Sequence, residues 1–371
     1  MHQSHILSIP KMLIHPLARA TTTSLQVAGT LQALKTNRPI GTHDGTFHCD
    51  EALACGLLKL LPEFAEKDIL RTRNEEILKE CEVVVDVGAT YDPDNLRFDH
   101  HQRSFETKFE DNRCTKLSSA GLVYKHFGKR IISTIATHHK IELNETIEDK
   151  IYTKVYSSFI EHVDAIDNGV PAMTGDKNYD VTTSLSARVG SLNPQWNQEY
   201  GDMSKGEFTC LQFKHAVDMT LNEFINCVSR LLLHWLPARE YVERAVKNRE
   251  SVHESKRIIK LEKSVPWTAH LFELEAEILQ ENKEKLAYVL YQRDSGDWSV
   301  QCVPEELGSF TSRLPLPIPY RGLRDDELSK AWGIPDCIFV HASGFIGGNK
   351  TYEGALEMAS KSLQLHNVNT K

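Results

Sequence analysis

The sequence predicts an α/β protein in which a doubly wound, mostly parallel sheet domain is followed by a helical connection and a smaller mixed α/β domain. Three observations predict it. Short β-branched runs alternate with helical stretches in the first third, helical periodicity dominates the middle, and strand-like runs return towards the end. A length of 371 residues also suits two domains, at roughly 100–200 residues each. The predicted segments are an N-terminal tail (1–37), the sheet domain (38–205), the helical connector (206–252) and the C-terminal domain (253–366).

The sheet domain begins with a strand at Ile40–Thr42, and a helix follows over Glu51–Leu61, where leucines recur at helical spacing. Further strands are expected at Ile69–Thr72, Glu82–Asp86 and Leu96–Phe98. The Glu82–Asp86 strand contains consecutive valines without polar alternation, which indicates burial on both faces. This pattern is typical of a parallel sheet covered by helices.

Helical periodicity runs through the middle of the chain. Its longest piece is Ile151–Asp167, and other helices are expected over Tyr179–Val189 and Phe208–Trp235, with Pro237 breaking the last one. The C-terminal domain returns to strands and one final helix. Its strands are predicted at Ile258–Leu261, Leu286–Tyr291, Trp298–Val303 and Cys337–His341, with a hairpin turn at Asp294–Asp297 and a helix over Tyr352–Leu363.

The composition excludes several classes of protein. A formal net charge of −8 argues against a broadly basic nucleic-acid binder, although an acidic site that binds divalent ions becomes locally positive. No apolar run approaches the roughly 18 residues of a membrane span, so no membrane partner is expected. The 8 cysteines form no C-x-x-C pair, which argues against a zinc ribbon and a thioredoxin-like motif. Their scatter favours reduced thiols inside a cell.

The first 40 residues contain no Asp or Glu, and they combine scattered basic residues with the hydroxyl-rich run Thr21–Ser24. This composition is typical of a mitochondrial transit peptide. A disordered tail is the alternative. In either case the folded part is expected to begin near Arg38.

Potential metal ligands collect at the ends of the predicted strands. His43, His48 and Asp50 lie between the first strand and its helix, and Asp86 ends the valine strand. The triplet Asp99-His100-His101 follows the next strand. Open α/β sheets bind their ligands at the carboxyl ends of their strands. Carboxylates and imidazoles gathered there suit two Mn²⁺ or Mg²⁺ ions, with Asp86 bridging them, and such sites attack phosphate esters with an activated water.

Two further carboxylates, Asp164 and Asp167, are three residues apart at the end of the long helix and share one face of it. One is expected to complete the metal site and the other to support it, and the sequence does not decide between them. His100 and His101 are adjacent on an extended segment, so their side chains point opposite ways. One imidazole therefore binds metal while the other faces the substrate phosphate.

A glycine-rich motif near the end of the chain is a candidate anion site. Glycines allow backbone N–H groups to approach a phosphate, and the following helix adds a favourable dipole. A simple turn is the alternative. The motif residues are Ser343, Gly344, Gly347, Gly348, Asn349 and Lys350, of which Lys350 offers a positive charge. Elsewhere Arg103, Phe105 and Arg188 are candidate contacts to base or phosphate, with packing or surface charge as the alternative.

These clusters, in this order, resemble the DHH phosphoesterase superfamily, and most closely its melanocyte-proliferating-gene exonuclease family. The resemblance extends over most of the globular chain. The resembling segments are Gly41–Glu51, Val84–Gly88, Phe98–Phe105, Thr115–Gly121, Val163–Gly169, Leu185–Val189, Trp235–Arg239 and Val340–Gly348, which includes His341.

The resemblance implies two metal positions, often filled by Mn²⁺. One would be held by His43, His48 and Asp86. The other would be held by Asp50, Asp86, His100 and either Asp164 or Asp167. The catalytic residues would be Asp86, His100 and His101, with His101 contacting or protonating the leaving oxygen. The C-terminal motif, with His341, would bind substrate. The family is similar to RNA 3′→5′ exonucleases of mitochondria and nucleus, which act in RNA processing.

Two positions depart from the resemblance. The superfamily usually has Asp where His48 stands, which shifts metal preference towards softer ions. The glycine motif often ends in His, whereas Asn349 follows Gly348 here. Asn can donate a hydrogen bond but cannot carry a positive charge.

The leading hypothesis is therefore a metal-dependent phosphodiesterase, a 3′→5′ exonuclease acting on single-stranded RNA. One alternative is a hydrolase of a small phosphate compound or a short oligonucleotide. Another is a non-catalytic, metal-dependent RNA-binding protein. The oligomeric state does not follow from the sequence.

Overall fold

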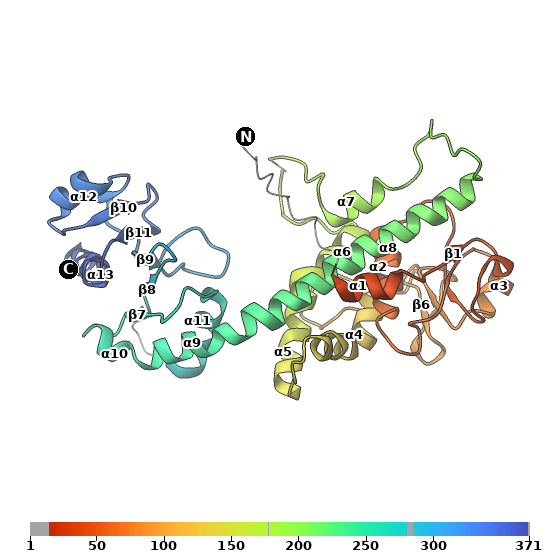
Figure 1. Cartoon of the computed structure of the whole chain (residues 1–371), viewed down its shortest axis with the longest axis horizontal. Helices are drawn as coiled ribbons and strands as arrows, with labels where there is room; N and C mark the ends of the chain where they lie inside the picture. The colour runs from red at the N-terminus through yellow and green to blue at the C-terminus, as the bar shows by residue number, and fades with distance from the viewer. Residues whose placement is uncertain (1–14, 177, 280–284, 370–371) are drawn as a thin grey trace, which may run out of the picture. The chain divides into compact units, whose positions relative to one another are not determined.

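A computed structural model describes residues 15–176, 178–279 and 285–369 of the chain (Figure 1). The chain divides into two compact units, Met1–Leu232 and Leu233–Lys371. Each unit contains one sheet, the first of six strands and the second of five. The predicted α/β class, with a mostly parallel first sheet, long helices and a second mixed sheet, is confirmed.

The first sheet has the strand order β1-β3-β2-β4-β6-β5. All neighbours pair in parallel except β5, which is antiparallel to β6. The chain leaves β2 (Ile40–Thr42) in one direction to β3 (Ile69–Arg71) and later returns on the other side of β2 to β4 (Val83–Val85). The order therefore reverses between β2 and β4, which is where doubly wound sheets bind their ligands.

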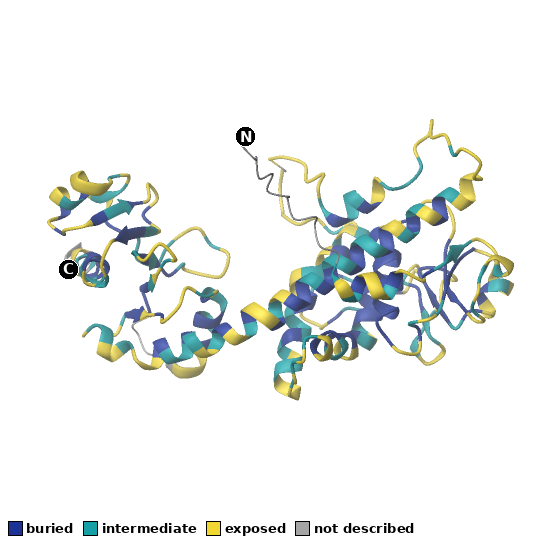
Figure 2. Ribbon diagram, in the orientation of Figure 1, coloured by how far each residue is buried: buried dark blue, intermediate teal, exposed yellow. Residues whose placement is uncertain are grey.

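Helices cover both faces of this sheet. On one face α2 (Cys49–Leu58) packs against α4 (Ser119–His138) and α8 (Lys205–Arg230). On the other, Leu78 of α3 (Glu75–Lys79) joins Leu70 and Val84 in an apolar cluster. The valine strand is buried on both faces as predicted. Figure 2 shows the buried and exposed faces of α8.

The remaining elements of the first unit are short apart from the run α5–η3–α6, in which η3 is a π-helical turn. Its sequence forms one helical stretch from Glu145 to Asp167, so the predicted Ile151–Asp167 helix is longer than expected. The other bounds are α1 (Pro16–Thr22), β1 (Val27–Ala28), η1 (Leu31–Ala33), β5 (Tyr91–Asp92), η2 (Pro93–Asn95), β6 (Arg97–Phe98), α5 (Glu145–Val155), η3 (Tyr156–Ile160), α6 (Glu161–Asp167) and α7 (Leu185–Gly190).

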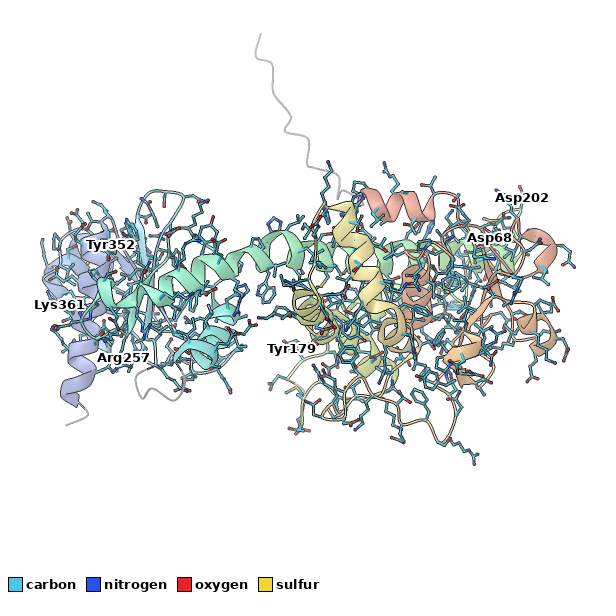
Figure 3. All side chains as sticks on the ribbon, turned by 90° about the horizontal axis from the view of Figure 1, so that it is seen from below. Asp68, Tyr179, Asp202, Arg257, Tyr352 and Lys361 are labelled. Carbon is cyan, nitrogen blue, oxygen red and sulfur yellow. The ribbon has the colours of Figure 1, made fainter. Side chains whose placement is uncertain are left out.

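The N-terminal segment begins the fold earlier than expected. We placed its start near Arg38, yet α1 packs against α8, and β1 pairs with β3 at the edge of the sheet. The buried carboxylate of Asp68 (labelled in Figure 3) accepts hydrogen bonds from the backbone N–H groups of Gln26, Lys35 and Thr36, at 2.8–3.2 Å. Of the predicted tail, residues 1–14 lie outside the described residues.

The second unit has the strand order β10-β11-β9-β8-β7, antiparallel except for the pair β7–β8. One apolar cluster joins the sheet to α12 and α13, and another joins it to α9 and α11. The predicted hairpin turn connects β8 to β9. The bounds are η4 (Leu231–Trp235), α9 (Leu236–Lys247), α10 (Arg249–Val252), β7 (Ile258–Lys260), α11 (Thr268–Leu274), η5 (Glu275–Leu279), β8 (Tyr288–Gln292), β9 (Trp298–Cys302), η6 (Ile318–Tyr320), α12 (Asp325–Trp332), β10 (Cys337–Val340), β11 (Ile346–Asn349) and α13 (Tyr352–Asn369).

Two helix predictions were wrong. The predicted helix Tyr179–Val189 forms only from Leu185, because Ser184 caps α7 by accepting a hydrogen bond from the backbone N–H of Ala187. Pro237 does not break the helical run, because the π-helical turn η4 precedes it and places the proline in the first turn of α9. Proline has no N–H to donate, so it suits a place where a π-helical turn already interrupts the regular α-helical hydrogen bonds.

No helix in the described part of the chain is long and apolar enough to cross a membrane. All 8 cysteines are free thiols, and Cys114 is the exposed one.

The Asp68 contacts predict a stability effect. Replacing Asp68 by Ala leaves three N–H groups without their acceptor and is expected to lower the free energy of unfolding by about 2 kcal/mol. Asp68→Asn keeps one acceptor oxygen and should lose less. Urea unfolding of both variants measures this, and an unchanged midpoint for Asp68→Ala would show that these contacts do not hold the N-terminal segment.

Candidate metal centre

Three neighbouring strands deliver the predicted ligands to one edge of the first sheet. His43 follows β2, Asp86 follows β4, and His100 lies two residues beyond β6. Because β4 lies between β2 and β6, Asp86 stands between the two imidazoles. The side chains from these three distant segments therefore lie close together, as predicted.

The first group of possible ligands is His43, His48, Glu51 and Asp86, whose ligand atoms all lie within 4.8 Å of one another. His43 Nε2 is 3.0 Å from Glu51 Oε1 and 3.3 Å from Asp86 Oδ2. Burial lowers the pKa of His43, but the hydrogen bonds and charges of Asp86 and Glu51 outweigh this effect and raise it to about 10. His43 is therefore protonated at neutral pH in the metal-free fold, and a cation bound there must displace that proton.

Asp86 is shared between this group and a second one with His100 and His101. Its Oδ1 lies 3.2 Å from His100 Nε2 and accepts a hydrogen bond from Ser119 Oγ at 3.1 Å. Burial disfavours the charge, but the imidazoles of His100 and His43 hold the pKa of Asp86 below its usual range. The residue has a φ of +58°, a left-handed conformation that Asp tolerates better than most side chains.

The third group is Asp50, His100 and Asp167. His100 Nε2 is 3.2 Å from Asp167 Oδ2 and 3.9 Å from Asp50 Oδ2. Burial and the neighbouring charges of Asp86 and Asp167 raise the pKa of Asp50 well above its usual range. Burial also raises the pKa of Asp167. Three carboxylates cannot remain ionised so close together without added positive charge.

The prediction that His100 and His101 point opposite ways is wrong: their ring centroids are 4.4 Å apart, and His101 Nδ1 lies 3.6 Å from Asp86 Oδ1. The chain has already left β6 here, so the alternation of a strand does not apply. His101 lies at the exposed edge of the second group. Its side chain is 60% exposed, and its Nδ1 lies 2.7 Å from Asp99 Oδ1. Asp99 is buried and is itself held by the backbone N–H groups of Ala89 and His101, at 2.6 and 3.1 Å. The bond to Asp99 is the main reason that the pKa of His101 is raised. The Nδ1 proton is thus fixed by Asp99, which leaves Nε2 available to a substrate.

The structure separates the two carboxylates that the sequence left as alternatives. Asp167 joins the third group, whereas Asp164 points to the start of α4. There its Oδ1 accepts hydrogen bonds from Ser118 N and Oγ, and its Oδ2 accepts one from Tyr156. Gly121 makes room for it, since a Cβ there would lie 2.4 Å from the carboxylate oxygens. Asp164 therefore binds helix α4 rather than the shared cluster.

Sequence reasoning missed Glu51 as a site residue, and it named Asp99 only as part of the triplet, without its hydrogen bond to His101. Glu51 looked like an ordinary acidic residue in the first turn of a helix, but its Oε1 also accepts a hydrogen bond from His48 N at 2.8 Å. The loop that carries the histidines is held from further away. Arg71 donates to Gly45 O at 2.9 Å, and the Asn193 amide bonds both backbone groups of Phe47.

A cavity of about 820 Å³ opens onto the cluster and is lined by residues of the first unit, His101, Asp50, Asp86 and Asp167 among them. Neither predicted arginine lines it. Arg103 is exposed in the loop after β6, and Arg188 forms a 2.5 Å ion pair with Glu223.

The predicted base contact of Phe105 does not fit the structure. Its side chain is buried and packs edge-on against His100 and Tyr91, with ring centroids 6.2 and 5.8 Å apart. It supports the histidine rather than facing a substrate.

The glycine motif of the second unit does not form the expected cradle. Gly347 and Gly348 lie within β11, which pairs with β9 and β10, so their backbone groups belong to the sheet ladders rather than to a turn before a helix. Asn349 is fully buried, and its side chain accepts hydrogen bonds from Thr351 and donates to Pro335 O.

The other residues of the motif lie around β11. His341 Nδ1 accepts a hydrogen bond from Ser343 N at 3.1 Å, and Lys350 is 3.5 Å from Asp336. Gly344 has a φ of +77°, and a Cβ there would lie 2.5 Å from the Arg321 side chain. The motif therefore builds the sheet and its turn.

The cluster fits divalent cations by its own unsatisfied atoms. Both carboxylate oxygens of Asp50 and Oε2 of Glu51 are buried and have no hydrogen-bond partner among the described residues. Such carboxylates can ionise in a buried site only where a counter-charge accompanies them. Imidazole nitrogens together with carboxylate oxygens suit Mn²⁺ better than Mg²⁺, which prefers oxygen ligands alone.

Comparison with known proteins then places the chain. A family model described as "Uncharacterised protein family (UPF0160)", and labelled as the MYG1 exonuclease family, matches residues 39–363. The chain belongs to the MYG1 exonuclease family. It is 49% identical to the mouse protein named MYG1 exonuclease over 332 residues, which cover 87% of this chain and 84% of that one.

Other members of the family are similarly close. The human MYG1 exonuclease is 47% identical over 331 residues, covering 87% of this chain and 85% of its own. The MYG1 protein of Dictyostelium discoideum is 46% identical over 326 residues, covering 87% and 96%. No solved structure matches the chain. The chain is thus a MYG1 exonuclease homologue with a buried His/Asp cluster that could hold metal ions.

Asp164 predicts a pH dependence of stability. Burial raises its pKa to about 7, against the hydrogen bonds from Ser118 and Tyr156. The unfolded chain has the ordinary value of 3.8, so over about pH 4–7 the folded protein holds a proton that the unfolded chain has lost. Stability from this group therefore falls as pH rises, by roughly 1.4 kcal/mol per unit.

Asp164→Asn should remove this slope while keeping acceptor and donor at the site. In urea unfolding with EDTA at pH 5 and pH 8, we expect the variant to gain roughly 3 kcal/mol relative to wild type at the higher pH. Parallel stability profiles of the two proteins would contradict the raised pKa.

Proposed function

We propose that this protein is a metal-dependent phosphodiesterase, and more narrowly a 3′→5′ exonuclease acting on single-stranded RNA. The observation that carries the proposal is the sharing of ligands: Asp86 belongs to two of the three ligand groups, and His100 joins the second to the third. Overlapping groups of this kind suit two neighbouring cations. The names of the mammalian relatives, which include the word exonuclease, support the reaction class.

Each ion would have its own set of ligands, with Asp86 common to both sets. His43, His48, Glu51 and Asp86 would hold one, and Asp50, Asp86, His100 and Asp167 would hold the other. The proposed ligand set differs from the one expected from the sequence in two ways. Asp167 is chosen over Asp164, and Glu51 is added. When bound, the ions would supply an activated water and neutralise charge on the phosphate.

The protein's own residues would supply the remaining chemistry. The buried carboxylates fix where positive charge collects, and therefore where a phosphodiester can lie. His101 faces the cavity with Nε2 free and a raised pKa, so it can donate a proton to the leaving oxygen. Asp99 acts as a positioning residue, because it holds the Nδ1 proton and the orientation of the ring.

The choice of RNA and the direction of digestion rest on the resemblance described above. Mn²⁺ is the proposed metal because two imidazoles enter the first group. Mitochondrial and nuclear localisation, and a role in RNA processing, are likewise proposals. Since α1 and β1 belong to the first unit, a mitochondrial leader would have to be cleaved before Pro16.

Asp86→Asn tests the proposed reaction. Asn tolerates the left-handed backbone at this position, so the fold should survive while the bridging charge is lost. With Mn²⁺ and end-labelled single-stranded RNA, we expect wild type to shorten the RNA from its 3′ end and Asp86→Asn to be at least about 10³-fold slower. EDTA should stop wild type, and Mn²⁺ should restore it.

Asp164→Asn is the matched control. It removes an equally buried carboxylate that the structure directs at Ser118 and Tyr156, so it should keep Mn²⁺-dependent activity. Full activity of Asp86→Asn, or of wild type in EDTA, would refute the metal-dependent reaction. Shortening from the 5′ end would refute only the proposed direction, and hydrolysis of small phosphates without RNA shortening would favour the alternative substrate class.

A further inference from the structure

The cavity beside the candidate metal centre carries an apolar wall that the proposed reaction does not use. Val163 and Ile166 line it from α6, four residues and one residue before Asp167. Val181 lines it from the segment before α7. Ile166 is 42% exposed and Val181 is 65% exposed. Figure 2 shows the segments around α7 as largely exposed. Aliphatic side chains therefore face solvent directly beside a charged cluster.

The charges of the cavity restrict what can bind there. No Lys or Arg lines it within the described part of the chain, and Arg188 of α7 is paired with Glu223 instead. A substrate phosphate must therefore lie at the metal end, where cations and His101 can meet its charge. The part of the substrate that reaches the apolar wall must be uncharged.

Ser184, Ser186 and Asn168 are polar residues that also line the cavity, and the amide of Asn168 is held in place. Asn168 lines the cavity, and its Nδ2 donates to Lys116 O at 3.1 Å and to Asp164 O at 2.9 Å. Both N–H bonds of the amide are thus used. The side chain can offer a ligand only its Oδ1, which is a hydrogen-bond acceptor.

We infer that this wall binds the base of the terminal nucleotide. The inference rests on the proposed function and names the substrate part that the same cavity would hold. A nucleobase is uncharged, has flat faces that pack against Ile166 and Val181, and carries N–H groups at its edge that can reach Asn168. A volume of about 820 Å³ lies in the usual range for a small-molecule site and leaves room for one nucleotide.

Binding of mononucleotides tests the inference without turnover. With the full chain loaded with Mn²⁺, calorimetry compares AMP with ribose 5-phosphate, which has the same phosphate and sugar but no base. Wild type should bind AMP at least about tenfold more tightly. Ile166→Ser should lose most of this preference while binding ribose 5-phosphate as wild type does.

Leu211→Ser is the control variant. Leu211 lies on α8, is 41% exposed and does not line the cavity, so it matches Ile166 in exposure alone. It should keep the preference for AMP. Equal binding of AMP and ribose 5-phosphate by wild type, or an unchanged preference in Ile166→Ser, would overturn the nucleobase site.

A parallel activity assay separates this inference from the proposed function. RNA with an abasic nucleotide at its cleaved end should be hydrolysed by wild type at least about tenfold less efficiently than normal RNA, and Ile166→Ser should treat the two alike. If wild type with Mn²⁺ hydrolyses neither RNA, the proposed function fails. If it hydrolyses both equally well, the function stands and the nucleobase site is wrong.

Discussion

The structure depends on one buried negative charge. Asp86 sits at the end of the central valine strand, and its two carboxylate oxygens lie against His43 from one neighbouring strand and His100 beyond the other. These imidazoles compensate a carboxylate that burial alone would neutralise. The strand order β2-β4-β6 makes the arrangement possible, because it places the ends of three distant sequence segments side by side. The functional cluster is therefore a consequence of sheet topology.

The imidazoles do not balance the negative charge of all the carboxylates in the cluster. Asp50 and Asp167 both have raised pKa values, and both oxygens of Asp50 are buried without a hydrogen-bond partner among the described residues. Such groups are costly in a fold that serves stability alone. Asp164, which lies on α6 with Asp167, differs from these groups because its two oxygens accept three hydrogen bonds. This difference supports the proposal that Asp50 and Asp167, and not Asp164, hold a cation.

The sequence could predict what local pattern determines. The valine run located β4 and so placed Asp86 at a strand end, and the Asp99-His100-His101 triplet followed the next strand. It could not separate Asp164 from Asp167, because their roles depend on which of them faces Ser118 and which faces His100. The glycine pair of β11 was misjudged for a similar reason. Glycines before a helix suit a turn or a strand equally, and distant pairing with β9 decided the outcome.

Anomalous diffraction from crystals grown with Mn²⁺ shows whether Asp86 is shared by two ions, because it locates the ions without reference to activity. We expect two manganese peaks in the first unit, both close to the Asp86 carboxylate, with His43 beside one and Asp167 beside the other. Crystals of Asp86→Asn should lose at least one peak. No manganese at Asp86 in the wild-type crystals, or manganese bound only elsewhere, would contradict a metal centre built on Asp86.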